Sequence, residues 1–278
     1  MRFTKMHGLG NDFVLSEEQI PASMLSTMAP KICDRHRGVG ADGLVFLLPT
    51  DKADIRMRII NADGSEAEQC GNAVRCVAKY VYESGMVRKK EMMIETKAGL
   101  QKVWVETANG QVQNVTVDMG EPMLEADQIP AKGSGQLIDE PIAVEGKTFH
   151  FTAVSMGNPH IAIEVEDAAQ FPVEQWGPLL ERHPRFPAKT NVEFFTVQAP
   201  DELIMRVWER GVGQTLACGS GACATAVAGV LLEKTKRRVL LHLQGGDLWI
   251  HWSEKDNHVY MTGTATTVFT GQLHERFR

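Results

Sequence analysis

Two cysteines in similar local sequences are the residues most suited to chemistry. Cys70 begins the segment Cys-Gly-Asn and Cys218 begins Cys-Gly-Ser, 148 positions later. We expect each cysteine just before or at the first turn of a helix, over about residues 71–84 and 219–234. A helix N-terminus can lower the pKa of a thiol from about 8.5 toward neutrality. The thiolate is then a usable base or nucleophile at cellular pH.

The same helix starts can bind a substrate anion, because their first N–H groups point outward and attract carboxylates. If two such starts face one cavity, a bound carboxylate has a thiol on each side of its α-carbon. One thiolate removes the α-proton while the other thiol delivers a proton to the opposite face. The helix N-termini stabilise the charge that develops on the carboxylate. The pattern therefore predicts stereoinversion beside a carboxylate, for which no cofactor is required.

The two cysteine segments belong to a longer repeat. Gly-Leu-Gly-Asn11 corresponds to Met-Gly-Asn158, and residues 42–47 correspond to residues 191–195. This order of elements predicts two related halves, each with three strands, a Gly/Cys loop, a helix and further strands. We expect domains at 1–118, with 264–278 added, and at 119–263. Alternating or apolar β-rich runs predict strands at 43–48, 55–60, 102–106, 112–117, 161–165, 193–197, 203–208, 239–243, 248–252 and 259–262.

The composition excludes several classes of protein. The chain has 278 residues, of which 43% are hydrophobic and 23% charged, as in a globular protein with a substantial core. A net charge of −6 disfavours a nucleic-acid binder, which needs a basic field. The most apolar helical run, 218–232, is too short to span a membrane, and no secretion signal is recognisable at the N-terminus. An odd number of cysteines, five, then indicates reduced thiols and a cytoplasmic protein.

Four segments together resemble the diaminopimelate epimerase family: KMHGLGNDF (5–13), NADGSEAEQCGNAVRC (61–76), GNPH (157–160) and ERGVGQTLACGSGAC (209–223). The resemblance implies a mixed α/β fold of two pseudo-symmetric domains, each a curled, mostly antiparallel sheet around a central helix. It implies an active site between the domains. The implied reaction converts LL-2,6-diaminopimelate to the meso form, without pyridoxal phosphate or metal, for lysine and peptidoglycan precursor synthesis. A small amino acid as the substrate and a homodimer are also implied.

The resemblance also assigns roles to single residues. Cys70 is the expected proton donor and Cys218 the expected acceptor for the LL substrate, with His160 and Glu209 supporting proton transfer. Two departures stand at Gly43, where some family members carry Gln, and at Gln214, where Glu is common. The implied substrate-binding residues are Asn11, Asn61, Gly71, Asn72, Asn158, Asn191, Glu209, Arg210, Gly219 and Ser220.

Simpler interpretations exist for most of these residues. Asn11 and Asn61 could only form turns, and Glu209 with Arg210 could be a surface ion pair. Cys33, Cys76 and Cys223 are expected to be small buried residues. The spacings C-x5-C and C-x4-C do not favour a zinc site, and no C-x-x-C redox motif is present. A two-thiol racemase acting on proline or hydroxyproline and a catalytically inactive binding protein are the remaining alternatives.

Overall fold

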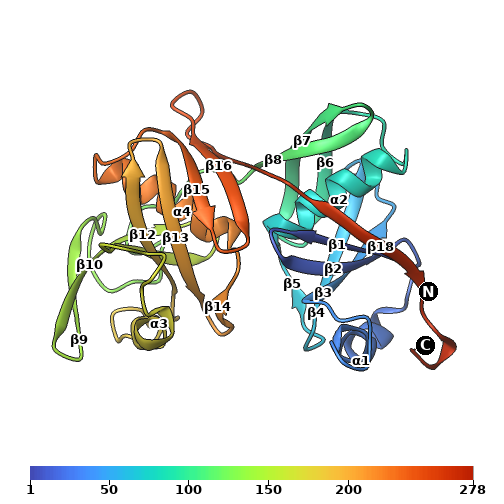
Figure 1. Ribbon diagram of the computed structural model, residues 1–278, viewed down its shortest axis with the longest axis horizontal. Coiled ribbons are helices and arrows are strands. Elements are labelled where there is room, and N and C mark those ends of the chain that lie inside the picture. Colours follow the sequence, from blue (N-terminus) through green and yellow to red (C-terminus); the bar gives the residue numbers. More distant parts are fainter. Residues whose placement is uncertain (278) are drawn as a thin grey trace. The chain divides into compact units, whose positions relative to one another are not determined.

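The computed structural model describes residues 1–277 and divides the chain into two compact units (Figure 1). The first unit is Met1–Val117 with Gly263–Arg278, and the second is Asp118–Thr262. Arg278, which ends the 264–278 segment predicted to join the first domain, lies outside the described residues. None of the described helices is long and apolar enough to cross a membrane.

The first unit is a mixed sheet with two α-helices. Its elements are β1 (Arg2–Gly8), β2 (Asn11–Ser16), α1 (Ala22–Cys33), β3 (Gly43–Leu48), β4 (Ile55–Asn61), β5 (Glu66–Ala67), α2 (Gly71–Glu83), β6 (Glu91–Thr96), β7 (Gly99–Ala108), β8 (Gln111–Asp118), β18 (Thr266–Gln272) and the 3-10 turn η1 (Glu275–Phe277). The strands pair in the order β18, β1, β2, β3, β4, β6, β7 and β8, and β5 also pairs with β4.

The second unit repeats this plan. Its elements are β9 (Glu140–Val144), β10 (Lys147–Ser155), β11 (Pro159–Glu164), α3 (Val173–Glu181), β12 (Asn191–Ala199), β13 (Glu202–Glu209), β14 (Gly213–Thr215), α4 (Gly219–Leu231), β15 (Arg238–Leu243), β16 (Gly246–Trp252) and β17 (Val259–Gly263). The strands pair in the order β9, β10, β11, β12, β13, β15, β16 and β17, and β14 also pairs with β13.

The direction of each pairing is the same in the two units. β1/β2 and β10/β11 are antiparallel, whereas β2/β3 and β11/β12 are parallel. The next pairs, β3/β4 and β12/β13, are antiparallel, and β4/β6 and β13/β15 are again parallel. The registers of the parallel pairs also correspond. Phe13 of β2 pairs with Gly43 of β3 in the first unit, and His160 of β11 pairs with Asn191 of β12 in the second.

Each sheet is wrapped around one helix, which explains the apolar sequences of α2 and α4. α2 contacts β1, β2, β4, β6 and β7, and α4 contacts β10, β11, β12, β13, β15 and β16. The predicted inner face of α2 is fully buried, at Val74, Val77, Ala78 and Val81. α4 buries nearly all of its residues, as its continuous apolar sequence predicts. The predicted fold class is therefore confirmed.

The structure corrects two predictions about helices. The helix predicted over 219–234 ends at Leu231, because Glu233 takes a left-handed conformation (φ 58°) and the N–H groups of Lys234 and Thr235 bond the Gly229 carbonyl. Each unit also holds a helix that was not predicted, α1 and α3, between its second and third repeated strands. Both contain an interior proline, Pro30 and Pro178, which normally signals the end of a helix.

Candidate active site

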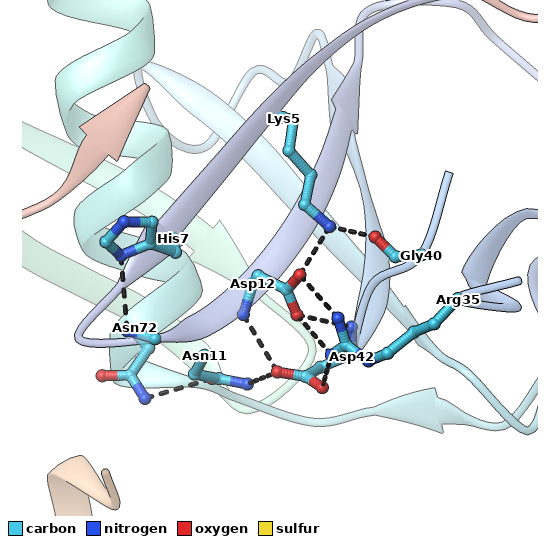
Figure 2. Close-up of polar contacts among 9 residues, drawn as sticks. Lys5, His7, Asn11, Asp12, Arg35, Gly40, Asp42 and Asn72 are labelled. Carbon is cyan, nitrogen blue, oxygen red and sulfur yellow. Dashed lines mark hydrogen bonds and ion pairs between the residues drawn. The ribbon is translucent and has the colours of Figure 1, made fainter. Parts of the chain in front are cut away.

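Cys70 is the N-cap residue of α2. Its backbone is extended (φ −154°, ψ 111°), and Gly71 is the first residue of the helix. Its Sγ donates to Oδ1 of Asn11, at the start of β2, over 3.6 Å. Nδ2 of Asn72 donates to the same oxygen at 3.1 Å (Figure 2). The structure thus brings four predicted site residues, Asn11, Cys70, Gly71 and Asn72, together at the N-terminus of α2.

The amide of Asn11 is held from its other side by a carboxylate. Nδ2 of Asn11 donates to Oδ2 of Asp42 at 2.7 Å, and the backbone N–H of Asp12 donates to the same oxygen at 2.9 Å. The second oxygen of Asp42 accepts a hydrogen bond from Nη2 of Arg35 at 2.8 Å (Figure 2). Asp42 therefore joins the loop after α1 to the start of β2.

Asp12 binds two cationic side chains of the same group, Arg35 and Lys5. Arg35 donates to both of its carboxylate oxygens, at 3.1 and 2.8 Å, and Nζ of Lys5 lies 2.6 Å from Oδ2. Burial alone would raise the pKa of Asp12, but the hydrogen bonds and charges of Arg35 and Lys5 outweigh it and lower this pKa to about 2. Asp12 is therefore ionised at neutral pH and fixes both cations.

Asn61 ends β4 beside this cluster. Its Nδ2 donates to Oγ of Ser65 at 3.0 Å, so its side chain bonds within a turn. Gly43 pairs with Asn61 across β3 and β4, and a Cβ added at Gly43 would lie 2.9 Å from the Ile60 carbonyl oxygen. A larger side chain at position 43 would thus need a local shift, which is the structural context of the departure noted there.

Cys218 is the N-cap residue of α4 and differs from Cys70 in its contacts. Its backbone is also extended (φ −120°, ψ 112°), and Gly219 is the first residue of the helix. Its Sγ accepts a hydrogen bond from the Gly221 N–H at 3.4 Å and lies 3.6 Å from Oγ of Ser220. The residue is 6% exposed. Predicted residues Gly219 and Ser220 thus lie in the first turn, next to the sulfur.

The expected lowering of a thiol pKa is wrong for Cys218. Burial raises its pKa well above the ordinary value, and the nearby carboxylates of Glu209 and Glu193 raise it further. The hydrogen bonds from Gly221 and Ser220 act in the opposite direction but do not outweigh burial. A helix N-terminus stabilises a thiolate through its partial positive charge. At this buried position, the free-energy cost of removing the thiolate from water is larger than that stabilisation. Cys218 is therefore a thiol at neutral pH here.

His160 is completely buried, as is its partner Glu193. Its Nδ1 is 2.7 Å from Oε1 of Glu193, and its Nε2 is 3.0 Å from Oδ1 of Asn158. A carboxylate only accepts hydrogen bonds, so Nδ1 carries a proton. Predicted residues His160 and Asn158 are thus in contact, and Glu193 fixes the orientation of the ring.

Glu209 ends β13, and its carboxylate is close to Cys218. Oγ1 of Thr215 donates a short hydrogen bond to Oε1 of Glu209. Burial raises the pKa of Glu209, while hydrogen bonds from Thr215 and Cys218 lower it in part. The net rise moves this carboxyl group toward the range in which it can exchange a proton near neutral pH.

Asn191 and Glu181 hold the turn that follows Glu209. Nδ2 of Asn191 donates to the Pro159 carbonyl at 2.7 Å, and its Oδ1 accepts the N–H of Arg210 at 2.9 Å. Glu181 accepts hydrogen bonds from the Gly211 N–H and the Trp208 indole N–H. The Arg210 side chain is exposed, and among residues 1–277 no ion pair joins it to Glu209. Asn191 therefore has a structural role in addition to its predicted one.

Comparison with known proteins identifies the family. The sequence pattern of the diaminopimelate epimerase family matches residues 3–125 and 152–268. A diaminopimelate epimerase from Pelotomaculum thermopropionicum is 54% identical over 280 residues, covering 99% of this chain and 100% of that protein. One from Moorella thermoacetica is also 54% identical, covering 98% and 99%. The chain belongs to the diaminopimelate epimerase family. It is therefore an enzyme, an isomerase of the epimerase type.

Solved structures agree on the fold of this epimerase at much lower identity. A probable proline racemase from Agrobacterium radiobacter is 17% identical with a TM-score of 0.74, covering 99% of this chain and 93% of that chain. A hydroxyproline epimerase from Agrobacterium vitis is 20% identical with a TM-score of 0.72, covering 98% and 90%. These likenesses show that the two-unit α/β architecture is common to all three chains.

Sequence reasoning missed three carboxylates that position the site of this epimerase family member. Asp42 was noted only as part of the repeat, and Glu181 lies on α3, which was not predicted. Glu193 carried a signal, because it is a charged residue within the apolar strand β12, whose first five residues are all buried. Among residues 1–277, no cluster of His, Cys, Asp or Glu side chains has the arrangement to hold a metal ion.

The low pKa of Asp12 predicts a specific acid sensitivity of the epimerase. A carboxylate whose pKa is lowered on folding stabilises the native state above its ordinary pKa of 3.8, and this contribution is lost as the pH falls toward about 2. Between those pH values, the free energy of unfolding should fall by about 2 kcal/mol more in the wild type than in Asp12→Asn, because the variant has no carboxylate to protonate at this position. Urea titrations at several pH values measure this. Identical pH dependence of the wild type and the variant would contradict the assignment.

Proposed function

We propose that this epimerase interconverts LL- and meso-2,6-diaminopimelate by moving a proton at one α-carbon between Cys70 and Cys218. The observation that carries the proposal is the matched position of the two thiols. Each is the extended N-cap residue of the central helix in its unit, and each helix begins with a glycine. The proposed substrate is supported by relatives that are 54% identical over nearly the full chain and are named diaminopimelate epimerase.

The proposed chemistry needs one deprotonated and one protonated thiol. For the LL substrate, Cys218 removes the α-proton as a thiolate, and Cys70 delivers its proton to the opposite face. The reverse reaction exchanges these roles. The first-turn N–H groups of both helices bind the reacting carboxylate and stabilise the charge that develops on it. The reaction requires neither pyridoxal phosphate nor a metal ion.

Glu209 is the proposed acceptor of the Cys218 proton. Because Cys218 is a buried thiol whose pKa is raised, it needs a base beside it before it can act. The pKa of Glu209 is also raised, and Cys218 is among its hydrogen-bond partners. His160 supports this side of the site through its hydrogen bonds with Asn158 and Glu193 and by lowering the pKa of Glu209 in part.

The remaining predicted residues are proposed to bind the two amino acid ends of the substrate. Arg210 has an exposed side chain next to Glu209, and a guanidinium can grip a carboxylate through two parallel hydrogen bonds. The other proposed binding residues are Asn11, Asn61, Gly71, Asn72, Asn158, Asn191, Glu209, Gly219 and Ser220. The product would serve lysine and peptidoglycan precursor synthesis. Five free thiols favour a reducing, cytoplasmic location.

The two-thiol proposal predicts that neither cysteine is dispensable. We expect Cys70→Ala and Cys218→Ala each to lower the rate of racemisation by about 10³-fold or more, since a positioned acid or base contributes about 10²–10⁴-fold. A chiral assay of purified enzyme with LL-diaminopimelate and a thiol reductant measures this, with L-proline as the alternative substrate.

Matched controls are available on the same helices. Cys76→Ala on α2 and Cys223→Ala on α4 remove buried thiols that are proposed to have no chemical role, so they should retain racemisation. Circular dichroism should show folded protein for all four variants. Near wild-type turnover in Cys70→Ala or Cys218→Ala would disprove the mechanism, and turnover of proline instead of diaminopimelate would disprove the substrate.

We also propose that the enzyme is a homodimer in which β18 contributes to the interface. Six of the seven residues of this strand are exposed, although one edge pairs with β1. They include Val268 at 53% and Phe269 at 46% exposure, at the bulge where the pairing of β18 with β1 shifts register. Burial against a second copy would remove this apolar surface from water.

The dimer proposal predicts that a charge on β18 changes the oligomeric state. Val268→Lys should shift the protein toward monomer, because it places an unpaired cation in the apolar contact. Leu100→Lys is the matched control, since Leu100 is 55% exposed in the same unit but lies on β7. Sedimentation velocity of both variants and the wild type measures the shift. A wild-type monomer, or equal behaviour of the two variants, would contradict the proposal.

A further inference from the structure

Four side chains form a continuous line of hydrogen bonds past Cys70. Arg75, which is 0% exposed, donates from Nη2 to Oδ1 of Asn72 at 2.7 Å. Nδ2 of Asn72 donates to Oδ1 of Asn11 at 3.1 Å. Nδ2 of Asn11 donates to Oδ2 of Asp42 at 2.7 Å. Figure 2 shows the last two links. We call Arg75, Asn72, Asn11 and Asp42 the amide chain.

The two ends of the amide chain determine its direction. A guanidinium has only donors, and an ionised carboxylate has only acceptors. Asn72 must therefore turn its oxygen toward Arg75 and its NH2 group toward Asn11. Asn11 must turn its NH2 group toward Asp42 and its oxygen toward Asn72. Reversing either amide would place two donors or two acceptors against each other, so the orientation follows from the end groups.

The direction of the hydrogen bonds in the amide chain determines which group of Asn11 faces Cys70. Its Sγ is 3.6 Å from Oδ1 of Asn11, which is an acceptor and never a donor while Asp42 holds the amide. An acceptor favours the S–H form of the sulfur and disfavours the thiolate. Cys218 differs, because its Sγ accepts the Gly221 N–H in addition to its hydrogen bond with the Glu209 carboxylate.

We propose that Asp42 is a positioning residue that, by fixing the amide of Asn11, keeps Cys70 in the thiol form from which it donates a proton. The inference rests on the proposed function, in which Cys70 is the donor for the LL substrate. Asp42 acts on the sulfur through Asn11, which donates to its carboxylate at 2.7 Å. The same carboxylate accepts hydrogen bonds from Arg35 and from the Asp12 N–H, and Arg35 also donates to Asp12.

Alkylation of Cys70 tests the proposal without using a substrate. The protein carries Cys218→Ala, so that Cys70 is the reactive thiol of the pair, while Cys33, Cys76 and Cys223 are buried. Iodoacetamide reacts with the thiolate, and the rate at neutral pH follows the thiolate fraction. Peptide mass mapping identifies the modified residue. Circular dichroism confirms that each variant is folded.

Asp42→Asn should increase the alkylation rate of Cys70 by about three-fold to ten-fold, the range expected for changing one hydrogen bond. Asparagine has nearly the same shape but can donate to Oδ1 of Asn11, so the orientation of that amide then depends on its hydrogen bond from Asn72 alone. Asp42→Ser also removes the carboxylate and should change the rate in the same direction. Arg35→Gln leaves the carboxylate in place and should change the rate by less than about two-fold.

A second background separates amide orientation from loss of charge. In the presence of Asn11→Ala, Asp42→Asn should no longer increase the alkylation rate, because the amide that transmits the effect is missing. An equal increase in that background, or an unchanged rate in both Asp42 variants with Asn11 present, would overturn the proposal. A negative racemisation assay together with the expected alkylation result would reject the proposed function but not the positioning role of Asp42.

Discussion

The structure depends on one local constraint, the extended backbone of the cysteine that immediately precedes the central helix of each unit. With this conformation the helix begins at the next residue, and the first N–H groups of the helix have no hydrogen-bond partner within the helix. At Cys218 it also places the sulfur beside those groups, since Sγ accepts the Gly221 N–H. Because Cys70 and Cys218 both adopt this conformation, each unit presents a thiol at the start of its central helix. The curled sheets then serve to bury one helix each and to bring strand ends to its start.

The two helix starts are alike in backbone but differ in electrostatics. Around Cys218, burial raises the thiol pKa, the carboxylates of Glu209 and Glu193 raise it further, and the hydrogen bonds from Gly221 and Ser220 lower it in part. Around Cys70, a line of side chains runs from a buried guanidinium to a carboxylate and presents an acceptor to the sulfur. Burial is therefore not a simple means of activation. It favours neutral thiols, and for this reason the proposed mechanism gives the Cys218 proton to a nearby carboxylate.

The sequence was sufficient for the features set by periodicity and spacing. The apolar face of α2 predicted its buried residues, and the shared offset of the cysteine segments predicted two units of similar order. The helices α1 and α3 could not be predicted in the same way, because Pro30 and Pro178 interrupt short patterns that tertiary packing still holds as helices. The end of α4 depended on a left-handed Glu233, a conformation that its residue type does not signal.

The candidate site was predictable where motifs repeat and not where residues act through others. Cys70, Asn72 and Asn11 are close together as expected, but the role of Asp42 appears only when the direction of each hydrogen bond is followed. The raised pKa of Cys218 was also beyond sequence reasoning, because it depends on how completely the residue is removed from water and on the carboxylates that folding places around it.

The most direct measurement of the two-thiol account is epimerisation of LL-diaminopimelate in D2O, followed by chiral separation and mass spectrometry at early times. Two separate acid–base groups predict that the meso product carries a single α-deuterium while recovered LL substrate is unlabelled, with no added cofactor or metal. Equal early labelling of substrate and product, or a requirement for pyridoxal phosphate, would contradict the account.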